Sequence, residues 1–229
     1  LDCADGAQAL AALHKAAVTV VLTSYKSQAM LDYAAVLLPV APFSETSGTF
    51  INTEGRVQSF YAATKPLGET RPAWKVLRVL GNLLGINGFE FNSSEDVRTE
   101  ALMSATDFVS GLDNGVTGVA LNPPAAAGGI ERVPDVPIHF ADPLVRRAPA
   151  LQRAADSAAP SARMNAATLK KFGLAVGELA KVGAGDTASV TLVAELDAGL
   201  PDNVIRVAAA HADSVALGPM FATLKVEKA

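Results

Sequence analysis

One stretch of this sequence carries most of the information on its fold: Phe43-Ser-Glu-Thr-Ser-Gly-Thr-Phe-Ile-Asn-Thr-Glu-Gly-Arg-Val-Gln58. In an extended segment, alternation would place on one side the side chains of Phe50, Asn52, Glu54, Arg56 and Gln58. A row of polar and charged side chains is costly to bury unless its members bond to one another or to a ligand. The stretch therefore predicts a polar strut, which we favour, or part of a binding surface.

The residues before this stretch predict a layer of helices and parallel strands. Residues 5–15 predict a helix that begins near Asp5, where a carboxylate favours the helix dipole. Val18–Leu22 and Ala35–Leu38 are short apolar runs typical of buried strands, joined by a brief helix at Ser27–Tyr33. This order favours parallel pairing. Two strands are too few for a free-standing sheet, so we expect further strands from elsewhere, and an open edge that favours self-association.

Two longer helices follow. Pro72–Leu84 begins with a proline suited to the first turn and is followed by Gly85, which suits the C-terminal exit. Its expected apolar stripe consists of Trp74, Val76, Leu77, Leu80 and Leu84. A second helix is predicted from Ser93 to about Ser104, with Asp96 three residues after Ser93, as in a capping box.

The sequence changes character after residue 110. Residues 111–137 are rich in Gly, Pro and Ala, and we expect a linker there. A short helix at 165–172 and several short β-branched segments follow, separated by Gly, Pro and Asp. These segments are Glu178–Val182, Ala188–Ala194, Val204–Val207 and Leu224–Glu227. We therefore predict an α/β domain over 1–110, a linker over 111–137 and a small β-barrel over 138–229.

Composition excludes several classes of protein. Of the 229 residues, half are hydrophobic and 18% are charged, which is typical of a globular chain. The net charge of −4 gives no basic surface for nucleic acid, and the longest apolar runs are too short to span a bilayer. Cys3 is the only cysteine, so the chain alone can build neither an intramolecular disulfide nor a multi-cysteine iron–sulfur centre.

No catalytic, cofactor-binding or metal-binding residue is assigned from the sequence. His14, His139 and His211 are far apart, and the pair His211 and Asp213 lacks further ligands or a nucleophile motif nearby, which favours a structural role. The carboxylates Glu45, Glu54 and Glu69 have no second feature that indicates acid–base chemistry. The Gly183-Ala-Gly185 run predicts a hairpin turn better than a phosphate loop.

The order of residues from Ala34 to Gln58 resembles the molybdopterin oxidoreductase superfamily, through Leu-Leu-Pro-x-Ala-x-Phe-x-Glu-x-x-Gly-Thr-Phe-x-Asn-Thr-Glu-Gly-Arg-Val-Gln. Pro66-Leu-Gly-Glu-Thr-Arg-Pro-Ala-Trp-Lys-Val-Leu77 is similar to one branch of it, the large iron–sulfur subunit of NADH:quinone oxidoreductase, respiratory complex I. Residues 162–169, 208–213 and 216–221 agree with that branch.

The resemblance implies a fold that is α/β and β: a partial Rossmann-like α/β layer followed by a small double-psi β-barrel. It implies a scaffold portion of the complex I subunit, which carries electrons from NADH through iron–sulfur clusters to quinone. We expect a C-terminal piece, since it starts at Leu1 without Met, that lacks the clusters of the parent subunit. The expected partners are the missing N-terminal part and other hydrophilic-arm subunits, at the cytoplasmic side of the bacterial inner membrane without insertion. The alternative is a fragment of a true molybdopterin-binding, formate dehydrogenase-like oxidoreductase, in which the barrel helps to bind the pterin nucleotide.

Overall fold

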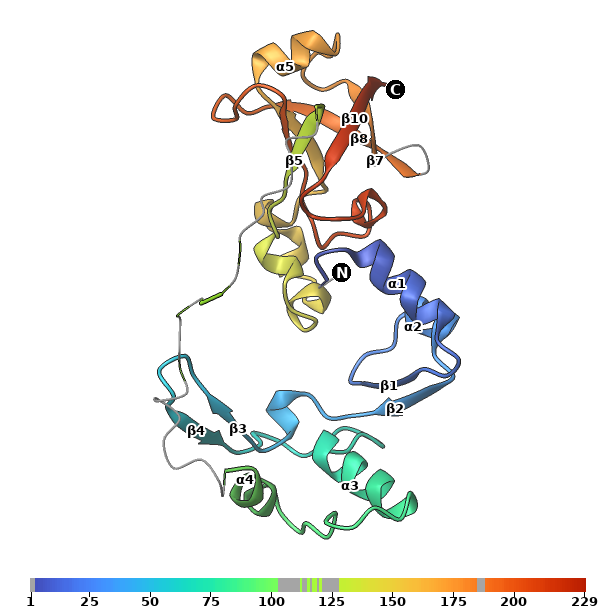
Figure 1. The fold of residues 1–229 in the computed structure, drawn as a ribbon, viewed down its shortest axis with the longest axis vertical. Coiled ribbons are helices and arrows are strands. Elements are labelled where there is room, and N and C mark those ends of the chain that lie inside the picture. The colour runs from blue at the N-terminus through green and yellow to red at the C-terminus, as the bar shows by residue number, and fades with distance from the viewer. Residues whose placement is uncertain are drawn as a thin grey trace. The chain divides into compact units, whose positions relative to one another are not determined.

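The computed structural model describes residues 3–102, 128–184 and 188–229, together with 112, 115, 117, 118 and 120. The chain divides into two compact units, one formed by residues 1–16 and 122–229 and the other by residues 17–121 (Figure 1). Each unit is described by itself. Among the described residues, no helix has the length and apolar character needed to cross a bilayer.

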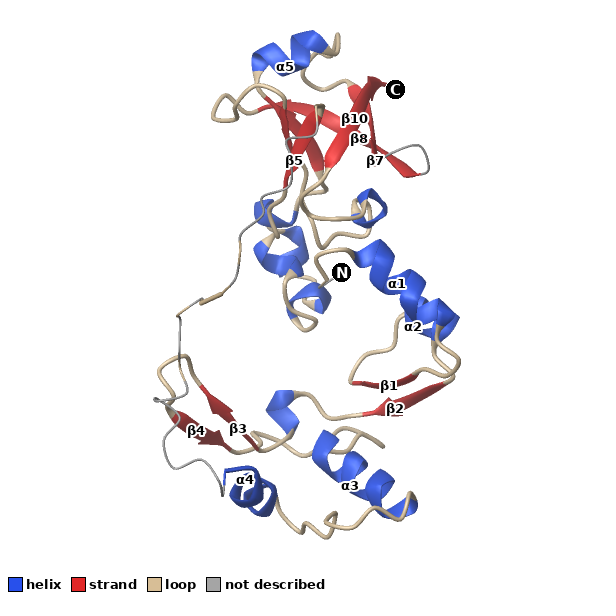
Figure 2. Cartoon of the chain, viewed as in Figure 1, coloured by secondary structure: helices blue, strands red, loops and turns tan. Residues whose placement is uncertain are grey.

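The first unit is built around a closed β-barrel of mixed strand direction, drawn in red in Figure 2. Its strands are β5 (Ile130–Val133), β6 (Ser161–Met164), β7 (Leu179–Ala184), β8 (Ala188–Leu196), β9 (Val204–Arg206) and β10 (Thr223–Lys228). Their order around the barrel is β10-β5-β9-β6-β8-β7, and β10 pairs with β7 to close it. The pairs β5–β9 and β6–β8 are parallel, and the others are antiparallel. The predicted small barrel is therefore present, while its double-psi connection stays a prediction.

The core of the unit lies inside this barrel. Buried and more exposed side chains alternate along much of the strands, and those of Ala162, Met164, Val182 and Ile205 are fully enclosed. The short helix α5 (Ala166–Lys171) begins at Asn165, whose side chain accepts a hydrogen bond from the Thr168 N–H at 2.8 Å. Single 3-10 turns make up much of the chain between β5 and β6: η2 (Ile138–Phe140), η3 (Val145–Arg147), η4 (Leu151–Arg153) and η5 (Ala155–Ser157).

The barrel unit contains two segments that the sequence analysis places elsewhere, namely strand β5 and the N-terminal helix. Strand β5 lies within the expected linker 111–137, and it pairs with both β9 and β10, so the barrel begins before residue 138. Sequence reasoning missed it because Ile130-Glu-Arg-Val133 is a short alternation set among Gly and Pro residues. Most of the expected linker lies outside the described residues.

The N-terminal helix α1 (Gly6–Lys15) also belongs to the barrel unit rather than to the α/β part. Asp5 caps it as predicted, accepting a hydrogen bond from the Gln8 N–H at 2.9 Å. The segment is tied to the barrel region by the Met220 N–H, which donates to the Ala4 carbonyl at 2.8 Å. Helix α1 packs beside η6 (Val215–Leu217), so a segment at the start of the sequence packs against one near its end.

The second unit contains the predicted strand–helix–strand order. Strand β1 (Val20–Thr23) is followed by α2 (Gln28–Tyr33) and β2 (Val36–Pro39), and β1 and β2 pair in parallel. The sheet formed by the described residues has two strands, as expected from the sequence. The Rossmann-like layering implied by the resemblance therefore stays a prediction.

The stretch quoted at the outset forms a hairpin rather than one extended strand. Strands β3 (Gly48–Ile51) and β4 (Val57–Phe60) pair antiparallel, with Phe50 opposite Gln58. Asn52 starts the turn, and its side-chain Oδ1 accepts hydrogen bonds from the N–H groups of Glu54 and Arg56 at 3.0 and 2.9 Å. The predicted row of polar side chains, and with it the buried strut, is therefore wrong, since the side chains of this turn are exposed.

The two predicted helices of this unit are present, as α3 (Ala73–Leu83) and α4 (Ser94–Leu102). The capping box at α4 is confirmed: Asp96 Oδ2 accepts from the N–H of Ser93 at 3.0 Å, and Ser93 Oγ accepts from the N–H of Asp96 at 3.1 Å. In α3 the buried position is Gly81, where the Phe89 ring packs too closely for a Cβ atom. Three members of the expected apolar stripe, Leu77, Leu80 and Leu84, are exposed.

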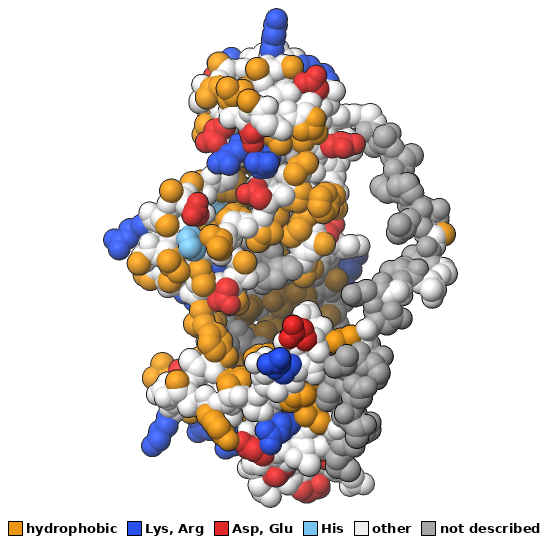
Figure 3. Space-filling view, turned by 90° about the vertical axis from the view of Figure 1, so that its left-hand side faces the viewer, with side chains coloured by type: hydrophobic (Ala, Val, Ile, Leu, Met, Phe, Trp, Pro, Cys, Tyr) orange, Lys and Arg blue, Asp and Glu red, His pale blue; other side chains and the backbone are white. Residues whose placement is uncertain are grey.

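The second unit buries few apolar side chains of its own. Ala41 is the one buried hydrophobic residue among its described residues, whereas Phe43, Phe50 and Leu83 are more than half exposed. Figure 3 shows such side chains in orange on the face drawn. Of these three, Phe43 and Phe50 line the same hollow, which is described below.

Candidate functional site

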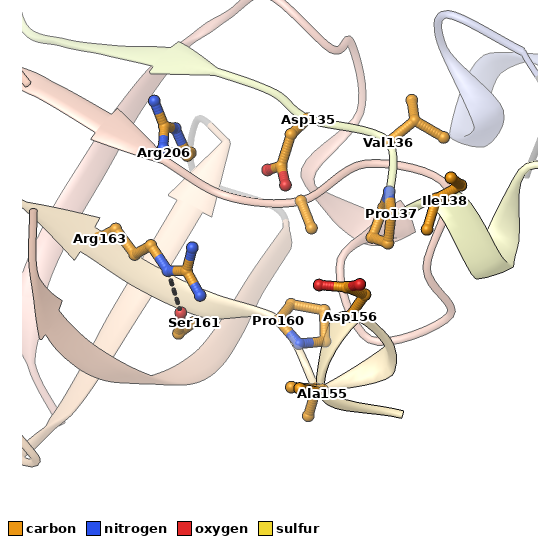
Figure 4. Close-up of a pocket in the computed structure, with 13 residues that line it drawn as sticks. Asp135, Val136, Pro137, Ile138, Ala155, Asp156, Pro160, Ser161, Arg163 and Arg206 are labelled. Carbon is orange, nitrogen blue, oxygen red and sulfur yellow. Dashed lines mark hydrogen bonds between the residues drawn. The ribbon is translucent and has the colours of Figure 1, made fainter. Parts of the chain in front are cut away.

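A hollow at one end of the barrel has a largely polar lining. Its volume is about 270 Å³. Figure 4 shows the segments that form it: the chain after β5, the η5 turn, and strands β6 and β9. Its polar and charged lining residues are Asp135, Asp156, Ser161, Arg163 and Arg206.

The strand register explains why two arginines meet here. Arg163 on β6 lies directly opposite Arg206 on β9 in an antiparallel pair. On its other side, Arg163 is the register partner of Glu195 on β8. Like charges directly opposite each other destabilise a sheet, and opposite charges stabilise it. The row across the three strands therefore needs a carboxylate for each arginine.

Both carboxylates are in place. Arg163 Nε donates to Glu195 Oε2 at 3.0 Å, and Arg206 donates from a terminal nitrogen to Asp197 Oδ2 at 2.9 Å. Ser161 joins the first pair, because its hydroxyl donates to Glu195 Oε2 at 3.0 Å and accepts from Arg163 Nε at 3.2 Å. Each arginine of the hollow thus forms an ion pair with a carboxylate of the same unit.

This arrangement limits the chemistry of the hollow. Two further carboxylates, Asp135 and Asp156, line it, and in Figure 4 the Asp135 carboxylate and the Arg163 guanidinium point toward the same space. The described lining contains neither His nor Cys, the usual proton-transfer and nucleophilic groups at neutral pH. The hollow can accept hydrogen bonds from a polar ligand, but it does not present an excess of positive charge.

A buried arginine lies close to this end of the barrel. Arg132 on β5 is 3% exposed, and its guanidinium donates to the carbonyls of Pro219 and Ala208 at 3.1 and 3.2 Å. Its Nε has no hydrogen-bond partner. Desolvation by burial lowers the pKa of this guanidinium below its usual value. Arg132 therefore holds two loops together by their backbone carbonyls.

The second unit has a larger and mainly apolar hollow, of about 450 Å³, between the β3–β4 hairpin, the start of α3, and α4. Its aromatic lining residues are Phe43, Phe50, Phe60 and Trp74. Phe50 and Phe60 stack with their ring centroids 5.4 Å apart. One charged side chain reaches it, that of Arg98, which donates to the Ser59 hydroxyl at 2.8 Å.

The histidines and carboxylates named in the sequence analysis do not form a reactive centre in the described part of the chain. His211 packs edge-on against Phe140, and its Nδ1 accepts the Asp213 N–H at 3.1 Å, which is a structural use of the pair. No group of three His, Cys, Asp or Glu side chains that could hold a metal occurs among the described residues. The hairpin expected at Gly183 is present as β7–β8, with residues 185–187 outside the description.

Sequence reasoning missed the paired arginines altogether. A signal was available in Ser161-Ala-Arg-Met164, where two polar residues alternate with two that are fully buried. The segment is only four residues long and follows a run of Ala, Ser and Pro. The second arginine comes from a strand more than forty positions away, so only the fold brings the two together.

Comparison with known families finds that residues 1–83 match the family described as molybdopterin oxidoreductase. The match spans α1 to α3 of the structure. This part of the chain is therefore similar to the molybdopterin oxidoreductases.

The particular relatives are formate dehydrogenase-like. A formate dehydrogenase-like protein of Staphylococcus aureus (strain bovine RF122 / ET3-1) is 49% identical over 55 residues, and its counterpart in strain USA300 is 47% identical over the same length. The matched segment is 24% of this chain and 6% of those relatives. Among solved structures, acetylene hydratase from Pelobacter acetylenicus aligns with all of this chain and 44% of its own, with a TM-score of 0.63 and 13% identity, which shows a shared fold.

Proposed function

We propose that this chain is a portion of a molybdopterin-type oxidoreductase related to formate dehydrogenases. The observation that carries the proposal is the match of residues 1–83 to that family, supported by the segment that is 49% identical to the Staphylococcus aureus protein. The barrel adds support at the level of the fold, through the likeness to acetylene hydratase. In this proposal the whole enzyme oxidises a small substrate such as formate, and this chain supplies framework for the site.

The described residues of the barrel-end hollow do not fit the phosphates of a pterin nucleotide. Phosphate groups are held by cationic side chains and N–H donors with charge to spare. Arg163 and Arg206 are each paired with a carboxylate, and Asp135 and Asp156 add negative charge to the same lining. We therefore assign no cofactor contact to this hollow and no catalytic step to its residues. Since the chain has one cysteine, iron–sulfur centres would also have to lie elsewhere in the parent protein.

The poor fit favours a second candidate, the scaffold portion of the large iron–sulfur subunit of complex I. In that role the chain keeps the architecture of a molybdopterin enzyme and carries no redox centre. The paired arginines of the hollow, and the buried apolar residues Ala209, Ala210 and Leu217 of the same unit, suit packing better than ligand binding. Its partners would be the rest of the subunit and its neighbours in the hydrophilic arm, at the cytoplasmic side of the bacterial inner membrane.

The intact parent protein distinguishes the two candidates. Metal analysis for molybdenum and tungsten, with fluorescence detection of the oxidised pterin, would be combined with a formate-dependent dye-reduction assay. We expect near-stoichiometric metal and pterin, with formate oxidation. Absence of metal and pterin from a folded parent that co-purifies with NADH:quinone reductase activity would contradict the proposal and support the complex I scaffold.

A further inference from the structure

A second hollow in the 17–121 unit differs in charge from the barrel-end one. It has a volume of about 520 Å³ and lies beside the start of α3, between the η1 turn (Phe43–Glu45), residues 62–66 and the first residue of α4. Three cationic side chains line it: Lys65, Arg71 and Lys75. We refer to it as the cationic hollow.

The positive charges of the cationic hollow have no carboxylate partners among the described residues. Arg71 donates to two backbone carbonyls, those of Thr70 at 2.7 Å and Gly68 at 3.3 Å, which fix the guanidinium without neutralising it. Lys75 Nζ lies 5.3 Å from the centre of the Trp74 ring, and that contact also leaves its charge in place. Glu45 is the one carboxylate in the lining, so the formal charge there is +3 −1, or +2.

The backbone and the uncharged side chains at this place also suit a negative group. Helix α3 has no side chain hydrogen-bonded at its N-terminus, where the first N–H groups lack partners within the helix. Helix α4, in contrast, is capped by Ser93 and Asp96. The lining also contains Thr64, whose hydroxyl can donate a hydrogen bond, whereas the Ser94 hydroxyl already donates to Glu95 Oε2 at 3.0 Å.

Glu45 is held by the backbone, because its Oε2 accepts the Leu67 N–H at 2.9 Å. The carboxylate thus shapes one wall of the cationic hollow by fixing the loop that carries Lys65. It also subtracts one charge from the three that face the ligand. This dual role makes Glu45 a useful position for a test, since its charge can be removed while an acceptor oxygen is kept.

We propose that the cationic hollow binds a phosphate-bearing small molecule, with Lys65 and Lys75 as the main contacts. The lining carries a formal charge of +2, although the whole chain carries −4. An anion is therefore attracted to this hollow in spite of the negative net charge of the chain. Lysine is a point-charge phosphate binder, and a hollow of this size admits a diphosphate with room beside it. The proposal concerns a site that the proposed function does not use, and either can fail without the other.

Trp74 provides a direct signal for the test, since it is the only tryptophan of the chain and lines the cationic hollow. The full 229-residue chain would be titrated with inorganic pyrophosphate and, in a separate arm, with ADP, following Trp74 emission and the heat of binding. We expect a saturable change in at least one arm that weakens as ionic strength rises. Binding of pyrophosphate alone would identify a free phosphate ligand, whereas tighter binding of ADP would identify a nucleotide.

Matched variants assign the signal to this hollow. Lys65→Ala should weaken binding by about fivefold, as expected for one partly exposed charge contact. Glu45→Gln should strengthen it, because it removes the negative charge and keeps an acceptor for the Leu67 N–H. Lys26→Ala changes the net charge equally at an exposed position outside the lining, so its affinity should equal that of the parent chain. Far-UV circular dichroism and melting curves would establish that each variant is folded.

Two outcomes would overturn the proposal. One is a chain with the parent's melting behaviour in which neither pyrophosphate nor ADP gives a saturable signal. The other is binding that Lys26→Ala weakens as much as Lys65→Ala does, since that would indicate general charge attraction rather than a site.

Discussion

Arg163 and Arg206 face each other directly across the antiparallel pair formed by β6 and β9, and each is bound by its own carboxylate. Two guanidinium groups in this register would repel each other if either carboxylate were lost. The two ion pairs, Arg163 with Glu195 and Arg206 with Asp197, therefore stabilise the barrel at the place where its polar hollow opens.

Glu195→Gln should lower the melting temperature because it removes the negative charge that pairs with Arg163. These side chains are roughly half exposed, so we expect a loss of up to about 1 kcal/mol, decreasing in high salt. Adding Arg163→Gln to this variant should recover part of the loss, because it ends the repulsion of Arg206. Glu131→Gln, on the exposed side of β5, is the matched control. A double variant less stable than Glu195→Gln would show that repulsion between the arginines is unimportant.

Arg132→Met should destabilise the barrel more than any exposed substitution. It keeps an apolar side chain of comparable length but removes the donors to the Pro219 and Ala208 carbonyls, and leaving a buried polar group without a partner costs about 1–3 kcal/mol. Hydrogen exchange should increase over residues 207–220 first. Arg132→Lys should not restore full stability, because an ammonium lacks the fork that reaches both carbonyls. Full stability in Arg132→Met would contradict the proposed link between the loops.

Gly6→Ala tests whether α1 is docked on the barrel unit. A Cβ atom at position 6 would lie 2.8 Å from Val215 Cγ2, so the helix or the Val215 side chain must shift if the helix is docked. In an undocked helix the same change is neutral or stabilising, because Ala has the higher helix propensity. We therefore expect a lower melting temperature and faster hydrogen exchange in residues 6–15. Val215→Ala in the same chain should reverse part of the effect, and a rise in stability from Gly6→Ala alone would contradict docking.

Glu178 predicts a pH dependence of stability. Its carboxylate accepts the Ala175 N–H and pairs with Lys228 at 2.7 Å, and these contacts lower its pKa below the ordinary value. A folded-state pKa below the unfolded one contributes stability at higher pH that is lost as pH falls through the folded-state value. The difference in melting temperature between the parent chain and Glu178→Gln should therefore be full at neutral pH and vanish in acid. A difference that stays constant into strong acid would contradict the assignment.

In the hairpin turn, we expect Asn52 to contribute more to stability than Arg56. Asn52→Ala removes two hydrogen bonds to backbone N–H groups, each worth about 0.5–1.5 kcal/mol, so the second unit should lose stability. Arg56→Ala changes an exposed side chain and should stay within about 0.5 kcal/mol of the parent chain. Chemical denaturation of both variants would check this order. The reverse order would revive the polar strut expected from the sequence.

Local signals in the sequence were sufficient for much of the fold. Asp5, the Ser93–Asp96 box and the apolar runs of β1 and β2 are each explained by residues within one or two turns of chain. The polar row predicted for residues 49–58 is wrong because it assumes one continuous extended segment. Asn52 and Gly55 instead form a turn, with Gly55 at φ 77°. The apolar stripe of α3 was identified correctly as apolar, but periodicity says nothing about whether a partner covers it.

The candidate sites were harder to predict because they depend on pairs distant in sequence. Arg163 and Arg206 meet only once β6 and β9 are in register, and Lys65 and Lys75 share a hollow only after the loop and helix fold back. The length of β5, four residues, and its setting among glycines also hid the first strand of the barrel. Such charged residues indicate a site only after the strand register shows which of them are neighbours.

The position of β10 in the barrel sets the order in which the ring can form during synthesis. The ribosome makes β10 after the other five strands, yet it is β10 that joins β5 to β7. Until it emerges, β5 and β7 are both unpaired edges, and unpaired edges recruit strands from other chains. A chain in which β10 is not yet paired therefore presents two open strand edges, so that closure of the ring by β10 also protects the barrel from pairing with other chains.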